Sequence, residues 1–233
     1  MNKDNLLKGI LSNKISMTPV GTVADQLPGE NFHAYKEQFF DKIIEISRSD
    51  ISSIHGYGEL NDNLETQYNS CHDYMIGTFA EDQEGYWYHW KEIFHTTILT
   101  REFFEKYYNL MLEYIPYCEN KRYLTYNNAF FVNMVIDENE VGFPDWSRAG
   151  IMDWLMDIAI MDLNKPYLNI IESFYDYCNK HSITVDHIKE RLLCLSYFKG
   201  IDVLRWHASI DDVESCESIM KSINELTDRI NKL

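Results

Sequence analysis

From residue 150 to the C-terminus, apolar residues recur at the three- and four-residue spacing of buried helix faces. This periodicity predicts helices over 154–161, 168–178 and 185–207. A final helix is predicted to begin at Asp211, which forms a capping-box pattern with Glu214. The last third of the chain is therefore expected to be almost entirely helical.

Two further helices are predicted in the first half of the chain. From Tyr35 onward, apolar residues repeat at helical spacing and form one stripe, made of Tyr35, Phe39, Ile43 and Ile46. Thr100 is a candidate N-cap for a second helix, which Pro116 is expected to end because proline cannot continue a helical ladder.

Short strands are expected in two places. Residues 130–136 and 140–145 flank the acidic turn 137–139, a pattern that predicts a β-hairpin. An alternating apolar run predicts one or two strands over 15–24, before a Pro-Gly turn signal. The chain is therefore predicted to be mostly α, of the α+β class, with a small hairpin in its middle.

The charge balance restricts the partners that the chain can have. Asp and Glu number 37 against 21 Lys and Arg, which gives a net charge of −16. Nucleic-acid-binding proteins grip phosphates with Lys and Arg patches, so no nucleic-acid partner is expected. An acidic surface attracts cations, including aminoglycoside-like molecules, although solubility alone also explains a negative total.

Cysteine use and hydropathy bear on the compartment. The 5 cysteines are odd in number and never in C-x-x-C spacing, which favours a reduced protein without a zinc site or disulfide framework. No stretch approaches the ~20 apolar residues that a membrane span needs, and the first residues lack a signal-sequence pattern. A cytoplasmic protein without a membrane partner is expected.

One stretch has the spacing of a kinase catalytic loop. Such loops combine a proton-accepting aspartate, an asparagine five residues later that holds magnesium, and a second metal-binding aspartate beyond a short hairpin. Here Asn128 and Asn133 have the five-residue spacing, and Asp145 follows the predicted hairpin. Because an amide neither takes up a proton nor supplies negative charge, Asn128 lacks the chemistry of the aspartate.

These motifs resemble those of the aminoglycoside phosphotransferase family, most closely its hygromycin-B-kinase-like branch. The stretch YNNAFFVN at 126–133 resembles the family's H-G-D-F-x-x-x-N, and GFPDWSRAGIMDWLMDIA at 142–159 resembles its V-I-D-W-S-E-A-x-x-G-D-x-x-Y-D-L-A. LPGENF, IHGYGEL and YHWKEIF resemble further family segments, so the likeness covers roughly residues 20–230. It implies the helical C-terminal lobe of a protein-kinase-like fold.

The family places a strand-built nucleotide lobe before the hinge, whereas only about twenty residues precede the hinge-like segment here, too few for such a sheet. The resemblance therefore implies that the N-terminal nucleotide lobe is largely missing, with residues 1–30 as its remnant and 31–233 as the helical lobe. Weak or absent ATP binding is expected, and Mg²⁺ is expected only if a nucleotide binds.

The resemblance also assigns roles to single residues. Asn128 stands at the position of the family's catalytic aspartate and Tyr126 at that of its histidine. Asn133 and Asp145 stand at metal-ligand positions; the alternative is that Asn133 hydrogen-bonds the loop and Asp145 caps a turn. Asp157, at the position of a later family aspartate, is expected to cap a helix or turn.

Substrate contacts are expected from Asp153 and from the loop that carries His55 and Tyr57. The alternative for that loop is a turn that needs its two glycines, Gly56 and Gly58.

Three functions remain open from the sequence. The leading hypothesis is a catalytically degenerate relative that binds a cationic, aminoglycoside-like molecule or a partner protein. The second is an active ATP- and Mg²⁺-dependent phosphotransferase, completed by another subunit. The third is an interaction module, in which a partner protein or a second copy covers the face that the missing lobe would occupy.

Overall fold

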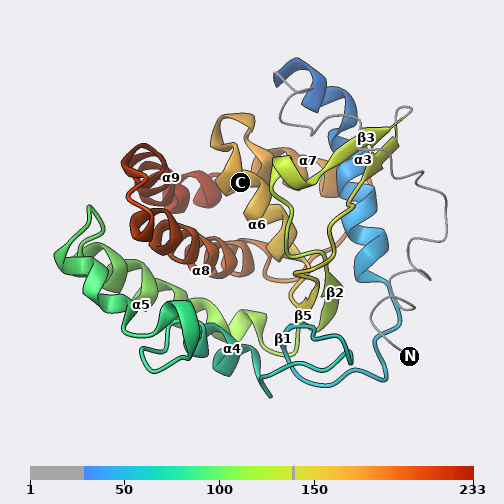
Figure 1. Cartoon of the computed structure of the whole chain (residues 1–233). Coiled ribbons are helices and arrows are strands. Elements are labelled where there is room, and N and C mark those ends of the chain that lie inside the picture. Colours follow the sequence, from blue (N-terminus) through green and yellow to red (C-terminus); the bar gives the residue numbers. More distant parts are fainter. Residues whose placement is uncertain (1–28, 138–139) are drawn as a thin grey trace. The chain divides into compact units, whose positions relative to one another are not determined.

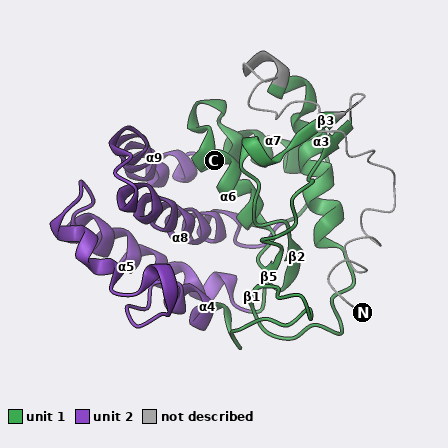
Figure 2. Cartoon of the chain, viewed as in Figure 1, with its two compact units in different colours: residues 1–71, 120–184 green, residues 72–119, 185–233 purple. Residues whose placement is uncertain are grey.

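The computed structural model describes residues 29–137 and 140–233, and its elements are labelled in Figure 1. Two units divide the chain, each assembled from two stretches that are far apart in the sequence (Figure 2). The first unit takes residues 1–71 and 120–184, and the second takes 72–119 and 185–233. The strands predicted over 15–24, and nearly all of the expected remnant at 1–30, lie outside the described residues.

A three-stranded antiparallel sheet in the first unit has the order β1-β5-β2. Its strands are Gly58–Glu59 (β1), Gly150–Met152 (β5) and Tyr123–Thr125 (β2). Ile151 at the centre faces Gly58 on one side and Leu124 on the other. Since β2 leads directly into the YNNAFFVN stretch and β5 follows Asp145 closely, the sheet anchors both parts of the predicted catalytic loop.

The predicted hairpin is confirmed, with shorter strands. Val135–Asp137 (β3) pairs antiparallel with Glu140–Gly142 (β4), and residues 138–139 lie outside the described part of the chain. Phe131–Asn133, predicted as strand, forms a 3-10 turn (η3) in which the Asn133 amide donates to the Phe130 carbonyl at 2.8 Å. This local bond replaces the ladder bond that a longer strand would have made.

The helices of the first unit are Gly29–Ser47 (α3), Leu155–Asn164 (α6) and Ile170–Lys180 (α7), with a 3-10 turn at Pro166–Leu168 (η4). The helix predicted from Tyr35 is confirmed and begins earlier. Aromatic rings on its buried face support the predicted loop: Phe32 contacts Phe131 with ring centroids 5.7 Å apart, and Phe39 contacts Phe143 at 6.2 Å. The helix α3 thus contacts residues just before and just after the hairpin in the chain.

Among the described residues of the second unit, the regular elements are all helices (purple in Figure 2). Its elements are Cys71–Gly77 (α4, whose first residue belongs to the first unit), Gly85–Trp87 (η1), Trp90–His95 (η2), Arg101–Cys118 (α5), Ile188–Ser209 (α8) and Val213–Asn231 (α9). The helix α8 packs against both α5 and α9, and its residues from Arg191 to Ile201 are all buried. The helix predicted over 185–207 is therefore confirmed, and this stretch of it is buried on every side.

Three predicted helix ends can be compared with the structure. Thr100 caps α5 as predicted, since its Oγ1 accepts from the Phe103 amide at 3.2 Å. The prediction for Pro116 is wrong, because α5 continues to Cys118 and a proline in the last turn removes only one ladder bond. The predicted cap at Asp211 is also wrong: Asp212 accepts from the Ser215 amide at 3.1 Å.

No helix in the described ranges is long and apolar enough to cross a membrane.

Candidate functional site

Asp157 on α6 holds the loop that follows β2. Its carboxylate accepts the Tyr126 amide at 2.9 Å through one oxygen and the Asn127 amide at 2.7 Å through the other. Asp157 is only 1% exposed, so these bonds satisfy two backbone donors away from water. This geometry fits the structural role predicted for Asp157.

Tyr126 ties the same loop to the hairpin. Its side chain is fully buried, its hydroxyl donates to the Asn133 carbonyl at 2.8 Å, and its ring contacts Phe143 and Trp146 at centroid distances of 4.7 and 5.3 Å. Burial raises the pKa of the Tyr126 hydroxyl far above its ordinary value. The hydroxyl therefore keeps its proton and holds the Asn133 backbone in place. A catalytic role for Tyr126 stays a prediction.

Asn128, Asn133 and Asp145 are brought together as their spacing predicts. The Asn133 amide nitrogen Nδ2 donates to Asn128 Oδ1 at 2.8 Å, and Asn128 Nδ2 donates to Asp145 Oδ2 at 3.1 Å. The other Asp145 oxygen accepts from the Ser147 amide at 3.0 Å. Asn128 therefore links the two residues at the predicted metal positions through its own amide, and no cation is needed to bridge them.

The arrangement does not fit Mg²⁺ in this conformation. Mg²⁺ requires a near-octahedral set of oxygen ligands. The Asn128 and Asn133 amides both direct N–H donors into the space between the three side chains. Within 29–137 and 140–233, no group of three or more His, Cys, Asp or Glu residues could hold a metal ion. The metal role of Asn133 and Asp145 stays a prediction.

Three residues to which the motifs assign no role complete the site, namely Glu59, Asn127 and Arg148. Arg148 donates to Glu59 Oε1 through Nη2 at 2.8 Å and Nε at 3.0 Å, which joins β1 to the segment after Asp145. The Asn127 Nδ2 donates to the Arg148 carbonyl at 3.0 Å and to Glu59 at 3.3 Å. The signal in the sequence was Arg148 itself, which stands where the family motif W-S-E-A has an acidic residue.

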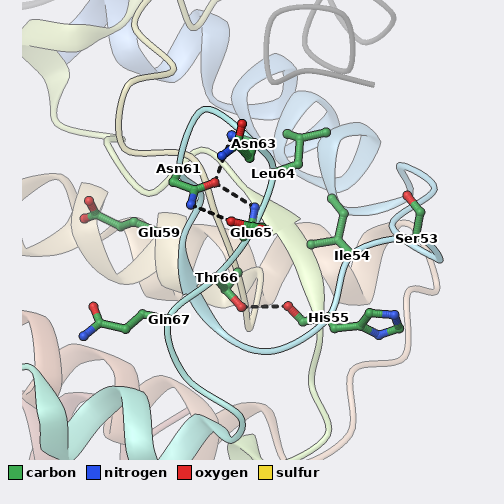
Figure 3. Close-up of a pocket in the computed structure, with 10 residues that line it drawn as sticks. All are labelled: Ser53, Ile54, His55, Glu59, Asn61, Asn63, Leu64, Glu65, Thr66 and Gln67. Atoms are coloured by element: carbon green, nitrogen blue, oxygen red, sulfur yellow. Dashed lines mark hydrogen bonds between the residues drawn. The ribbon is translucent and has the colours of Figure 1, made fainter.

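A polar pocket of about 930 Å³ lies beside this ion pair in the first unit (Figure 3). Its wall is one loop and includes Glu59 and Glu65, two exposed carboxylates. Asn61 donates to Glu65 at 3.1 Å, and Thr66 donates to the His55 carbonyl at 2.7 Å. The remaining lining residues are Ser53, Ile54, Asn63, Leu64 and Gln67. Most of these groups are hydrogen-bonding side chains.

Arg122 and a glycine fix the backbone of the loop that lines this pocket. The Arg122 guanidinium donates to the Ile54 carbonyl at 2.5 Å and the Gly56 carbonyl at 3.2 Å. Gly56 has φ +77°, and a Cβ there would lie 2.3 Å from both Thr66 Oγ1 and the Tyr68 carbonyl oxygen. The turn therefore requires glycine at this position. This agrees with the interpretation of the loop as a glycine-dependent turn.

The expected substrate residues lie in different environments. His55 is exposed and lines the pocket. Tyr57 is 4% exposed, and Asp153 is 1% exposed with its carboxylate accepting from the Leu155 amide at 3.1 Å. The burial of Tyr57 and Asp153 favours roles in shaping the loop and the start of α6. A direct substrate contact for any of the three stays a prediction.

Several solved structures share this fold. A thermostable mutant of aminoglycoside phosphotransferase APH(4)-Ia, in a ternary complex with AMP-PNP and hygromycin B, superposes with a TM-score of 0.72 at 18% identity, over 90% of this chain and 68% of that chain. A second mutant, with ADP and hygromycin B, gives the same values. APH(4)-Ia itself gives 0.70 at 16% identity, over 90% and 68% of the two chains.

No protein-family model and no curated protein matches this chain in sequence. The structural superpositions alone show that the chain has the kinase-like fold of the aminoglycoside phosphotransferase APH(4)-Ia, as its motifs predicted.

Proposed function

We propose that the chain is an aminoglycoside-phosphotransferase-like protein that binds a cationic, hydroxyl-rich small molecule and does not transfer phosphate through its 126–133 loop. The observation that carries the proposal is the hydrogen bond from Asn128 Nδ2 to Asp145 Oδ2 at 3.1 Å. In this bond a neutral amide stands at the position where a phosphotransferase has its proton-accepting carboxylate.

The loss of the carboxylate removes two contributions to catalysis. An amide at 128 has no basic oxygen for the proton of the attacking hydroxyl, and it supplies no negative charge to the site. Removing one stabilising group from an active site typically lowers the rate by about 10²–10³. Asn128 itself is 5% exposed and bonded at both ends, so solvent does not readily replace the missing base.

The pocket beside β1 supports the binding of a cation. Glu65 provides negative charge, and Glu59 adds a carboxylate whose charge Arg148 offsets in part. Amide and hydroxyl side chains of the same segment offer donors and acceptors to ligand hydroxyls. The net charge of −16 adds a long-range attraction for a polycation. Two of the superposed structures are complexes with hygromycin B, a ligand of this chemical class.

An active phosphotransferase is the second candidate. The observations that favour it are the fold and the retained spacing of Asn133 and Asp145 around the loop. It requires the Asn128–Asp145 contact to open so that Asp145 binds Mg²⁺ together with ATP. The two candidates differ in one measurable property, because only the second predicts phosphate transfer by the unmodified chain.

Isothermal titration of the chain with hygromycin B, and with other aminoglycosides in parallel, tests the binding proposal. We expect saturable binding that weakens at least about tenfold in the double variant Glu59→Gln/Glu65→Gln, because two pocket carboxylates are lost. The matched control is Glu102→Gln/Glu105→Gln, which removes the same charge from exposed residues of α5. An equal loss in both variants, or no binding by any of the aminoglycosides, would contradict a ligand site at this pocket.

A further inference from the structure

Four large apolar side chains are exposed in the second unit near the junction of α8 and α9. Tyr86 is 66% exposed, Trp206 47%, Ile210 49% and Val213 44%. The last three follow one another at the end of α8 and the start of α9, where the two helices pack together (Figure 1). We call these four residues the α8–α9 patch.

Hydrogen bonds bring Tyr86 to this junction from a segment more than a hundred residues earlier. Its hydroxyl lies 2.9 Å from Ser209 Oγ, and Ser209 Oγ lies 2.6 Å from the Trp206 carbonyl oxygen, to which it donates. Ser209 is the last residue of α8 and directly precedes Ile210. The four apolar side chains therefore surround one turn of the chain and are not scattered over the unit.

A buried arginine keeps the Tyr86 segment in place. The Arg205 guanidinium lies 3.8 Å from the centroid of the Trp87 ring, and it donates to the Thr78 carbonyl at 2.9 Å and to Asp202 at 2.8 Å. Arg205 is 1% exposed, so its stacking on Trp87 is shielded from water and stronger than at an open surface. A patch that is already ordered loses little entropy when a partner binds.

Acidic residues are frequent in the two chain segments that carry the patch. The segment 81–86 contains Glu81, Asp82 and Glu84, and the segment 206–217 contains Asp211, Asp212, Glu214 and Glu217. Neither segment contains a lysine or an arginine. Glu81 is paired with Lys91 at 3.1 Å and Asp212 with His207 at 2.9 Å, which leaves the surroundings strongly acidic in total.

We propose that the α8–α9 patch binds a basic amphipathic segment of another protein, with the partner's apolar side chains on Trp206 and Ile210 and its Lys or Arg side chains on the acidic rim. The acidic residues around the patch favour a basic partner over the alternatives. A second copy of the chain also carries −16 and an equally acidic rim, so self-association is opposed by like-charge repulsion. An anionic membrane surface is repelled for the same reason.

Fluorescence anisotropy with two labelled probe peptides tests the proposal on the full chain. The first is a helical peptide of leucine and lysine with one apolar face, and the second has glutamate in place of every lysine. We expect saturable binding of the lysine peptide and none of the glutamate peptide. Trp206→Ser should weaken binding at least about tenfold, as expected for a central aromatic contact. Glu84→Gln/Glu214→Gln should weaken it and reduce its dependence on salt.

The matched control is Tyr167→Ser, because Tyr167 is 65% exposed in the first unit and lies outside the patch. This variant should bind the lysine peptide as the unmodified chain does. Equal binding of both peptides, or equal weakening by Tyr167→Ser and Trp206→Ser, would overturn the proposal. Sedimentation equilibrium tests whether a second copy of the chain occupies the patch instead. A dimer that Trp206→Ser dissociates would assign the patch to self-association and would also overturn the proposal.

Discussion

The substitution Asn128→Asp restores the aspartate of the kinase motif, and it should destabilise the protein in the absence of metal. Asn128 Nδ2 lies 3.1 Å from Asp145 Oδ2, so the change replaces a hydrogen bond with two facing carboxylate oxygens. Two unit charges about 4 Å apart repel by about 1 kcal/mol in water and about 4 kcal/mol at an effective dielectric constant of 20. Because Asp145 is exposed, solvent screens the pair and we expect about 2 kcal/mol.

Urea unfolding monitored by circular dichroism measures this loss, and its pH dependence identifies the cause. Repulsion raises the folded-state pKa of the carboxyl pair above the unfolded value of about 3.9. The destabilisation is therefore complete above the raised pKa and disappears as the pH falls below about 4. Mg²⁺ should restore stability to the variant at pH 7, because a cation between two carboxylates binds the folded state preferentially.

The exchange variant Asn128→Asp/Asp145→Asn is the control. It keeps one amide and one carboxylate in contact, and the Asn133 and Ser147 donors still find acceptors. Its stability at pH 7 should lie within about 0.5 kcal/mol of the unmodified chain. Carboxylate repulsion is not the cause if Asn128→Asp alone is as stable as the unmodified chain at pH 7, or if the exchange variant is no more stable than the single one.

Three other predictions concern the surrounding structure. Asp157→Ala should lower the free energy of unfolding, measured by urea titration, by about 2–5 kcal/mol, because two buried backbone donors lose their acceptor. The control Asp62→Ala, at an exposed position, should change the free energy of unfolding little. The hydrogen bonds from Ser215 lower the pKa of Asp212 in the folded state. The stability that Asp212 contributes is therefore present above its unfolded pKa and is lost as the pH falls through its folded pKa. The variant Asp212→Asn should not show this acid-dependent loss when the free energy of unfolding is measured against pH. Burial raises the pKa of the Cys178 thiol to about 11, so iodoacetamide at pH 8 should label Cys178 in the native protein far more slowly than in urea, as mass spectrometry of the digested chain would report.

Local patterns predicted the helices and the contacts of the loop well. The apolar stripe from Tyr35, the cap at Thr100 and the hairpin after Asn133 depend on neighbouring residues, which the sequence displays directly. The Asn128–Asn133 spacing also predicted a contact correctly, because a loop of five residues returns its ends to one place.

Features that depend on tertiary partners were not predictable from the sequence in the same way. The role of Arg148 follows from its pairing with Glu59, a residue far away in the chain. Asp212, and not the predicted Asp211, caps α9. Asp211 adopts φ 59°, a left-handed conformation after the end of α8 that no spacing rule reveals. Likewise, the expected substrate residues Tyr57 and Asp153 are buried by packing that the motif does not describe.

The most direct test of the proposed function is a phosphate-transfer assay at stoichiometric protein concentration, with γ-labelled ATP, Mg²⁺ and hygromycin B. We expect no transfer to the drug above the protein-free background, even though the drug binds, because Asn128 supplies neither a base nor a negative charge. Transfer by the unmodified chain that Asp145→Asn abolishes would contradict the account and would establish an active phosphotransferase.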